Sequence, residues 1–227
     1  CCQFACCIVD PLFVSTMPPA HLPAIEHNAA CHWPSEQDYL LHAIEASLPV
    51  REGRDLLLWT QGPLHALLPH RVMLCVRFDA HNQLQQLECL HGAALDAGVH
   101  ARLSRRDDEG LAMRLAHHCR SRHESMLPAL LDADSGVPAG KGGAGQPLAA
   151  FRDELRELGL HNMLLHGSGP LPGGATFFAL FGMPQRPHTQ HAYFLQLLLP
   201  YLHLALQRVG QRQTHTGKAT LARPASA

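Results

Sequence analysis

The chain has 227 residues, with 18 basic and 19 acidic side chains and a formal net charge of −1. This length suits one well-buried domain, and the neutral balance excludes the basic surface that usually binds nucleic acid. Because no run approaches the roughly 18 to 20 apolar residues of a membrane span, we expect a soluble, cytoplasmic chain that does not bind DNA by itself.

The first predicted elements are helical. Residues 1–34 are rich in proline and lack an apolar period, which predicts a poorly ordered lead-in. The folded domain is predicted over residues 35–209. Ser35 can cap a first helix, with Asp38 in the capping-box position and apolar residues at helical spacing up to Pro49. A second helix is predicted from about residue 52, with a break at Gly62 and a short continuation.

Two strands and a helix follow in the middle of the chain. Residues 71–78 and 84–91 predict an antiparallel hairpin, because both runs are short and strand-like and are separated by turn-forming residues. A helix is expected over residues 110–123. The glycine-rich segment 132–147 predicts an exposed loop, because Lys141 is not followed by the Ser or Thr of a phosphate-binding loop.

The last third predicts a helix over residues 148–158, a second hairpin from residues 161–166 and 175–181, and a long helix over residues 189–209 that Pro200 bends. Residues 210–227 are predicted to be a disordered tail. Hairpins interspersed with helices indicate an α+β fold. We expect helices gathered on one face of a single antiparallel sheet, in two or three layers, as is common among small-molecule sensory domains.

The eight cysteines predict neither disulfides nor a metal site. Four of them lie at the start of the chain, and no downstream pair completes a zinc site with Cys2 and Cys6. The other cluster comprises His117, His118, Cys119 and His123. We expect reduced thiols in the cytosol, no metal and no cofactor.

No local motif predicts catalysis. Gly167-Ser168-Gly169 lacks the complete G-x-S-x-G nucleophile elbow and is interpreted as part of a hairpin connection. The acidic residues Asp107, Asp108 and Glu109 are interpreted as charges at the start of a helix. We therefore predict no catalytic residue and no enzyme.

Candidates for a ligand pocket are apolar or histidine side chains next to the predicted sheet. An apolar cavity would be lined by such residues, although aromatic side chains at regular spacing also fill ordinary cores. The two histidines lie near strand ends and could donate hydrogen bonds to a ligand or be satisfied at the sheet edge. The candidates are Trp59, Cys75, His91, Phe151, His166 and Phe177, with Phe178 as a further wall residue.

The terminal helix carries a candidate dimer seam. Tyr193, Leu197, Tyr201 and Leu204 recur at three- and four-residue steps, which places them on one helix face. This seam could join two protomers of a homodimer or pack against the domain's own sheet; both alternatives remain open.

Four segments resemble the N-terminal half of EpsA-like LuxR-family transcription regulators, which accompany exopolysaccharide and protein-sorting loci in some proteobacteria. They are AIEASLPVREGRDLLLWTQGPLHALLPH (43–70), FRDELRELGLHNMLLHG (151–167), TFFALF (176–181) and LLLPYLHLALQRV (197–209). The resemblance implies a GAF-like or autoinducer-binding-like sensory domain whose terminal helix leads into a LuxR-type helix-turn-helix. It implies a possible small-molecule signal, and it assigns no ligand residue.

The sequence after Val209, GQRQTHTGKATLARPASA, departs from that pattern because it contains no recognisable DNA-reading domain. A truncated gene, a frameshift and an isolated regulatory fragment all remain open. Our leading hypothesis is a regulatory module that responds to a ligand or a partner. The alternatives are a small hydrolase or transferase with an unrecognised site, and a truncated homologue that acts only by dimerising with a full-length regulator.

Overall fold

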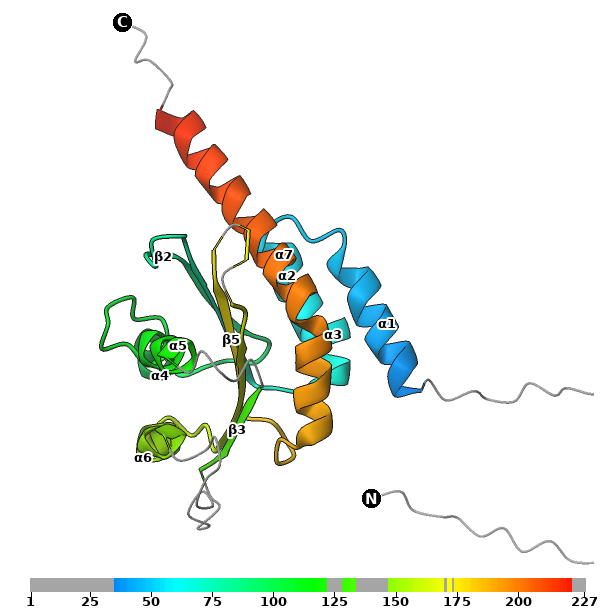
Figure 1. The fold of residues 1–227 in the computed structure, drawn as a ribbon, viewed down its shortest axis with the longest axis vertical. Coiled ribbons are helices and arrows are strands. Elements are labelled where there is room, and N and C mark those ends of the chain that lie inside the picture. The colour runs from blue at the N-terminus through cyan, green and yellow to red at the C-terminus, as the bar shows by residue number, and fades with distance from the viewer. Residues whose placement is uncertain (1–34, 122–127, 134–146, 170, 173, 222–227) are drawn as a thin grey trace, which may run out of the picture. The chain divides into compact units, whose positions relative to one another are not determined.

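A five-stranded antiparallel sheet with the order β2-β1-β5-β4-β3 forms the centre of the domain. The structure, a computed structural model, describes residues 35–121, 128–133, 147–169, 171–172 and 174–221. Helices cover both faces of the sheet, so the domain has three layers (Figure 1). The predicted α+β fold with an antiparallel sheet and a long C-terminal helix is confirmed.

The first three helices lie on one side of the sheet. They are α1 (Glu36–Ser47), α2 (Gly53–Gln61) and α3 (Pro63–Leu67). The predicted capping box is present, because the Ser35 side chain accepts from the Asp38 N–H and the Asp38 carboxylate accepts from the Ser35 N–H. Pro63 occupies the first position of α3, where its missing N–H costs no helical hydrogen bond.

The first hairpin consists of β1 (Val72–Phe78) and β2 (Leu84–His91), as predicted. It is followed by α4 (Ala97–Leu103), α5 (Leu111–Ser121) and the short strand β3 (Ala129–Asp132). Neither α4 nor β3 was predicted. The carboxylate of Asp96 caps α4 by accepting from the N–H groups of Gly98 and Val99.

The second half begins with the 3₁₀ turn η1 (Pro147–Phe151), which leads into α6 (Arg152–Glu157). The second predicted hairpin, β4 (Asn162–Gly167) and β5 (Thr176–Phe181), occupies central positions, where β5 pairs with β1. The last helix, α7, spans Thr189–Leu221. It therefore continues past Val209, and the prediction that residue 210 begins a disordered tail was wrong for residues 210–221.

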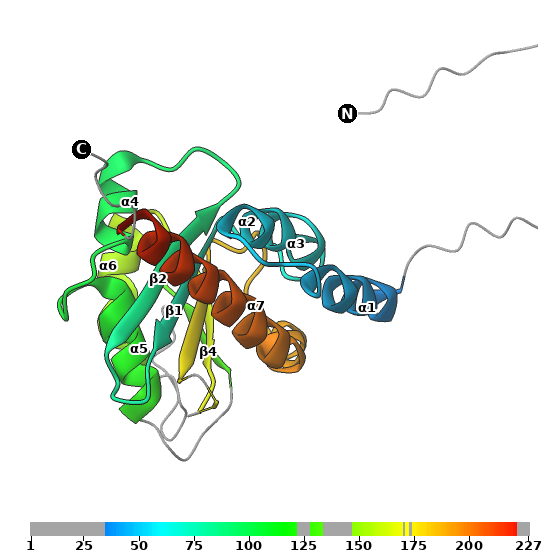
Figure 2. The same ribbon diagram turned by 90° about the horizontal axis from the view of Figure 1, so that it is seen from above.

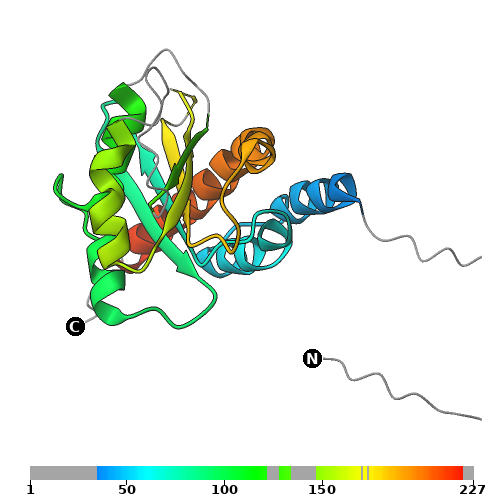
Figure 3. The ribbon, with the colours of Figure 1, turned by 90° about the horizontal axis from the view of Figure 1, so that it is seen from below.

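Successive side chains of a strand point to opposite faces of the sheet, so the central strands contribute to two separate cores. Val72, Leu74 and Phe177 point to the core under α4, α5 and α6. Met73, Cys75 and Phe178 point to the core under α1, α2, α3 and α7. Figures 2 and 3 show these two helical layers on opposite sides of the strands. The expectation that all helices gather on one face was wrong, because the central strands bury apolar side chains on both faces.

The predicted lead-in, the glycine-rich loop from residue 134 and the end of the tail fall outside the residues that the structure describes. Within the described ranges, no helix combines the length and the hydropathy that crossing a membrane requires.

Candidate functional site

The six predicted ligand residues lie on two opposite faces of the sheet. His91, Phe151 and Phe177 belong to the face covered by α4, α5 and α6, which we call the α5 face. Trp59, Cys75 and His166 belong to the face covered by α7. The six residues therefore do not line one pocket. The division follows from strand register: His91 lies opposite Val72, whereas His166 lies opposite Phe178.

The three predicted ligand residues on the α7 face are hydrogen-bonded or buried within the fold. The indole Nε1 of Trp59 donates to the carbonyl of Ala43 at 2.8 Å, which ties α2 to α1. Burial raises the pKa of the Cys75 thiol well above its ordinary value, so this thiol is protonated and unreactive. Burial also lowers the pKa of His166 from 6.5 to about 4, so its ring is neutral at pH 7.

The α5 face combines aromatic rings with cationic side chains. The guanidinium of Arg120 lies 4.8 Å from the centre of the buried Phe78 ring, and that of Arg114 lies 5.5 Å from the Phe151 ring. The exposed ring of His117 lies 6.2 Å from Phe78. Such cation–π contacts stabilise a cation beside a ring but provide no hydrogen-bond acceptor.

Arg120 has an unmet hydrogen-bonding requirement at this site. Its Nη1 is buried and has no hydrogen-bond partner among the residues that the structure describes. A buried N–H without an acceptor is costly, and in native proteins it often marks a place where a ligand, an ion or a water binds. Sequence reasoning missed both Arg120 and Phe78, because only the packing of α5 against the end of β1 brings them together.

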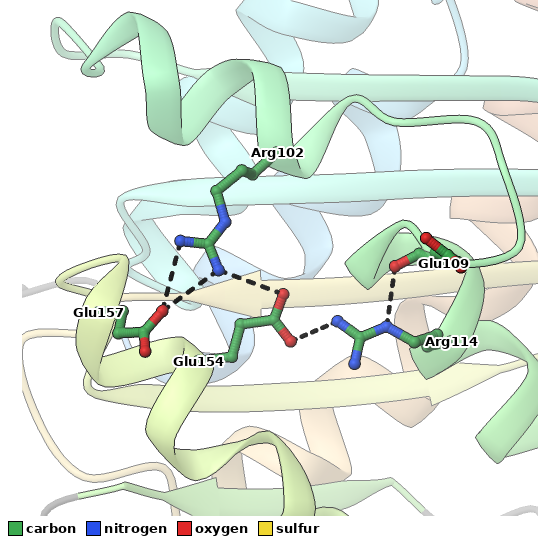
Figure 4. A network of polar contacts seen from close by, with 5 residues as sticks. All are labelled: Arg102, Glu109, Arg114, Glu154 and Glu157. Carbon is green, nitrogen blue, oxygen red and sulfur yellow. Dashed lines mark hydrogen bonds and ion pairs between the residues drawn. The ribbon is translucent and has the colours of Figure 1, made fainter.

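Ion pairs hold α4, α5 and α6 together as one layer over this face. Glu154 of α6 accepts from Arg114 of α5 and also lies 3.6 Å from Nη2 of Arg102 on α4. Arg102 reaches Glu157 at 3.4 Å, and Nε of Arg114 donates to the carbonyl of Glu109 at 3.0 Å (Figure 4). Glu154 is the central residue, because it joins two helices to a third.

A hydrogen-bonded chain joins α7 to the sheet on the opposite face. Thr176, at the start of β5, contacts Nδ1 of His203 at 3.1 Å and the hydroxyl of Ser168 at 3.0 Å. Nε2 of His203 lies 3.4 Å from the carbonyl of Pro172. The side chains that form this hydrogen-bonded series are all buried: Ser168, Thr176 and His203. Burial lowers the pKa of His203, and the nearby charge of Arg77 acts in the same direction.

The predicted dimer seam is largely exposed. The exposed fractions are 57% for Tyr193, 37% for Leu197 and 49% for Leu204, whereas Tyr201 is half-buried. Leu48, which caps the C-terminus of α1, lies close to this seam, because Arg208 donates to the carbonyls of both Leu48 and Leu204. Arg208 thus links the C-terminus of α1 to the turn of α7 that carries Leu204.

The histidine and cysteine cluster of α5 does not form a metal site with described neighbours. In the part of the chain that the structure describes, no group of three His, Cys, Asp or Glu side chains is placed to hold a metal ion. His123 and the N-terminal cysteines fall outside that part.

Similarity to known proteins is found in the structure and not in the sequence. No family model matches the sequence, and no curated protein matches it either. The structure is similar to that of the N-acylhomoserine lactone dependent LuxR-family transcription factor CepR2 from Burkholderia cenocepacia, with 12% identity and a TM-score of 0.51. That match covers 79% of this chain and 98% of CepR2's chain.

Two further solved structures are similar. A domain with bound biliverdin IXa, in its far-red absorbing dark state, matches with 12% identity, a TM-score of 0.51 and coverage of 75% of this chain and 98% of that chain. A phycoerythrobilin-bound GAF domain from a cyanobacterial phytochrome matches with 13% identity, a TM-score of 0.47 and coverage of 80% and 99%. The chain therefore shares its fold with CepR2 and with the biliverdin-bound protein.

Proposed function

We propose that this chain is the sensory and dimerisation region of a LuxR-type transcription regulator in the cytoplasm. A small molecule binds between the sheet and the layer formed by α4, α5 and α6, and α7 carries the response. The chain acts as a binding module, not as an enzyme.

The buried, unpartnered Nη1 of Arg120 is the observation that carries the ligand-binding part of this proposal. The guanidinium lies over the Phe78 ring, at the edge of an apolar core that also contains Phe151 and Phe177. A ligand with an apolar body and an oxygen acceptor would pack against the rings and complete the hydrogen bonding of Arg120. The similar structures support this ligand class, since CepR2 depends on an N-acylhomoserine lactone and another neighbour holds biliverdin.

Thermal unfolding with defined ligands tests this proposal. We would measure Tm with N-acylhomoserine lactones of short to long acyl chain and with biliverdin. Binding to the folded state alone raises Tm in a concentration-dependent manner. We expect one of these ligands to raise Tm for the parent chain and for Arg106→Met, which changes an exposed arginine.

The same ligand should bind at least about tenfold more weakly to Arg120→Met, which keeps most of the side-chain volume and removes the donor. Equal affinity for Arg120→Met would reject Arg120 as a ligand contact. No stabilisation by any of the compounds would contradict a ligand of this class.

We also propose a homodimer through α7, because exposed apolar side chains gather on one helical layer. Among the described residues, nine large apolar side chains are exposed. Eight of them belong to α1 with its cap residue, to α2 or to α7; only Leu171 lies elsewhere. An apolar surface of this kind on a water-exposed layer usually marks a protein interface.

In the proposed regulator, a LuxR-type helix-turn-helix domain outside these 227 residues contacts the DNA, and the target genes direct exopolysaccharide synthesis. The EpsA-like segments support this assignment. It can be tested in a strain with an EpsA-like regulator, by expressing this chain and measuring transcription of the exopolysaccharide genes. Mixed dimers should reduce regulated transcription at least about twofold, and the substitution Leu197→Ser should restore it. Unchanged transcription with the parent chain would contradict the assignment.

A further inference from the structure

The last anchored turn of α7 ends at a glycine that lies on polar groups of the sheet. Up to Val209, α7 buries a continuous series of apolar side chains: Phe194, Leu195, Leu198, Leu202, Ala205, Leu206 and Val209. Gly210 follows directly and is also buried, whereas residues 211–213 are exposed. The apolar anchoring of α7 among the described side chains therefore stops at Val209.

Arg77 of β1 and Gln86 of β2 lie beneath Gly210. They are direct cross-strand partners, so their side chains emerge side by side on the α7 face. A Cβ at position 210 would lie 2.6 Å from Oε1 of Gln86 and 2.7 Å from Nη2 of Arg77. A side chain at position 210 would therefore push the ends of these two side chains out of their present positions. We call Arg77 and Gln86 the polar seat of α7.

The polar seat is poorly satisfied while α7 covers it. Nε of Arg77 and Oε1 of Gln86 are both buried, and within the described ranges neither has a hydrogen-bond partner. Partial burial lowers the pKa of Arg77, against the opposing effect of the Asp79 carboxylate. Gln86 Nε2 donates to Glu88 at 3.0 Å, and Gln213 reaches the same carboxylate oxygen at 3.4 Å. This long contact links Gln213 to the seat strands, and Arg212 forms an ion pair with Glu52, the residue before α2. Release of the helix end breaks both contacts.

These contacts favour release of the helix after Gly210 and oppose release of the helix before it. Withdrawal of the helix end would expose Arg77 and Gln86 to water and relieve two unsatisfied groups. Withdrawal of the preceding turns would expose apolar side chains such as Leu206 and Val209. Glycine also weakens the helix locally because it has the greatest backbone freedom to lose.

We propose that Gly210 is a hinge and that the α7 segment from Gly210 onward leaves the polar seat as a unit, while residues 194–209 stay packed on the sheet. The hinge is a property of the chain itself and requires no bound ligand. It gives the helix end two positions, seated and released, which a change at β1 or β2 can shift.

Hydrogen exchange of the full chain, followed by mass spectrometry, tests the hinge through Gly210→Ala. Alanine favours the helix, so a helix end that is free of the sheet would exchange roughly fivefold more slowly at residues 211–217. In the seated position the added methyl group would meet the ends of Gln86 and Arg77, and moving these ends disfavours that position, so a seated end would exchange faster. We expect faster exchange at residues 211–217 and unchanged exchange at residues 198–206. Slower exchange would overturn the proposal. Gly53→Ala is the matched control, because its Cβ would meet nothing within 4 Å.

A second variant, Arg77→Met with Gln86→Leu, should change the rate of hydrogen exchange in the opposite direction. Apolar side chains remove the unsatisfied groups and hold the helix end down, so exchange at residues 211–217 should slow roughly fivefold or more. The control pair is Arg106→Met with Gln83→Leu, which changes the same residue types at exposed positions. Cooperative thermal unfolding of each variant shows that it is folded. Exchange equal to that of the control pair in a folded double variant would also overturn the hinge.

Discussion

Nδ1 of His203 on α7 lies 3.1 Å from Oγ1 of Thr176 on β5, and this contact sets the direction of a chain of hydrogen bonds. The Pro172 carbonyl can only accept, so Nε2 of the neutral His203 ring carries the proton. Nδ1 then accepts from the Thr176 hydroxyl, which accepts in turn from the Ser168 hydroxyl. Oγ of Ser168 accepts from the Thr176 N–H at 2.9 Å. Every group in this chain is satisfied.

Replacing Thr176 with valine should therefore destabilise the domain. Thr176→Val keeps the shape but leaves Nδ1 of the buried His203 without a donor, which costs about 1 to 3 kcal/mol in the free energy of unfolding. Urea denaturation at pH 7 measures the loss. The control is Thr60→Val, because the equally buried Thr60 hydroxyl donates to the carbonyl of Leu57 in its own helix. If Thr176→Val loses no more free energy of unfolding than Thr60→Val, these hydrogen bonds do not stabilise the domain.

The buried histidines should make the domain less stable in mild acid. Burial lowers the pKa of His70 and of His166 from 6.5 to about 4. Between these values the unfolded chain binds protons that the folded chain does not, so stability falls as pH drops from about 6.5 to about 4. At about 1.4 kcal/mol per pKa unit, His70 contributes on the order of 3 kcal/mol to this loss.

Urea denaturation at several pH values between 7 and 4 measures that dependence. His70→Gln removes one titrating group, so its stability should decline less steeply than that of the parent, whatever its stability at pH 7. His81→Gln changes an exposed histidine and should keep the parent's slope. Parallel curves for His70→Gln and the parent would show that His70 is not the group responsible.

Loss of the charge on Glu154 should loosen the helical layer of the α5 face. Glu154→Gln weakens the ion pairs with both Arg102 and Arg114, and Glu154 is mostly shielded from water. We expect a loss of about 1 kcal/mol in the free energy of unfolding. Glu157→Gln is the control, since the more exposed Glu157 contacts only Arg102 among these arginines and should cost less. Equal losses of stability in the two variants would show that Glu154 is not the main residue joining these helices.

Self-association should depend on the exposed part of α7. Tyr193→Ser with Leu197→Ser removes two large apolar side chains from the proposed interface, so the dimer should become a monomer. Light scattering coupled to size exclusion measures the mass. Leu171→Ser is the control, because Leu171 is equally apolar and exposed but lies in the β4–β5 connection. An unchanged mass for the double variant would exclude this interface.

Local signals in the sequence were enough to predict most of the secondary structure. Turn-forming residues between short apolar runs predicted both hairpins, because strand pairing across a short turn is decided locally. Ser35 and Asp38 predicted the start of α1, since a capping box involves residues only three positions apart. The helix end beyond Val209 was missed because its apolar period stops there, although extending an existing helix requires no new nucleus.

The sequence by itself thus determined the hairpins, the long terminal helix and the α+β class, all of which follow from local pattern. Only the tertiary structure decided that the sheet is covered on both faces, and it thereby separated Trp59, Cys75 and His166 from His91, Phe151 and Phe177. It also paired Arg120 with Phe78, and Thr176 with His203. These pairs join segments far apart in the chain, and their contact depends on strand order, register and helix packing, which no local pattern encodes.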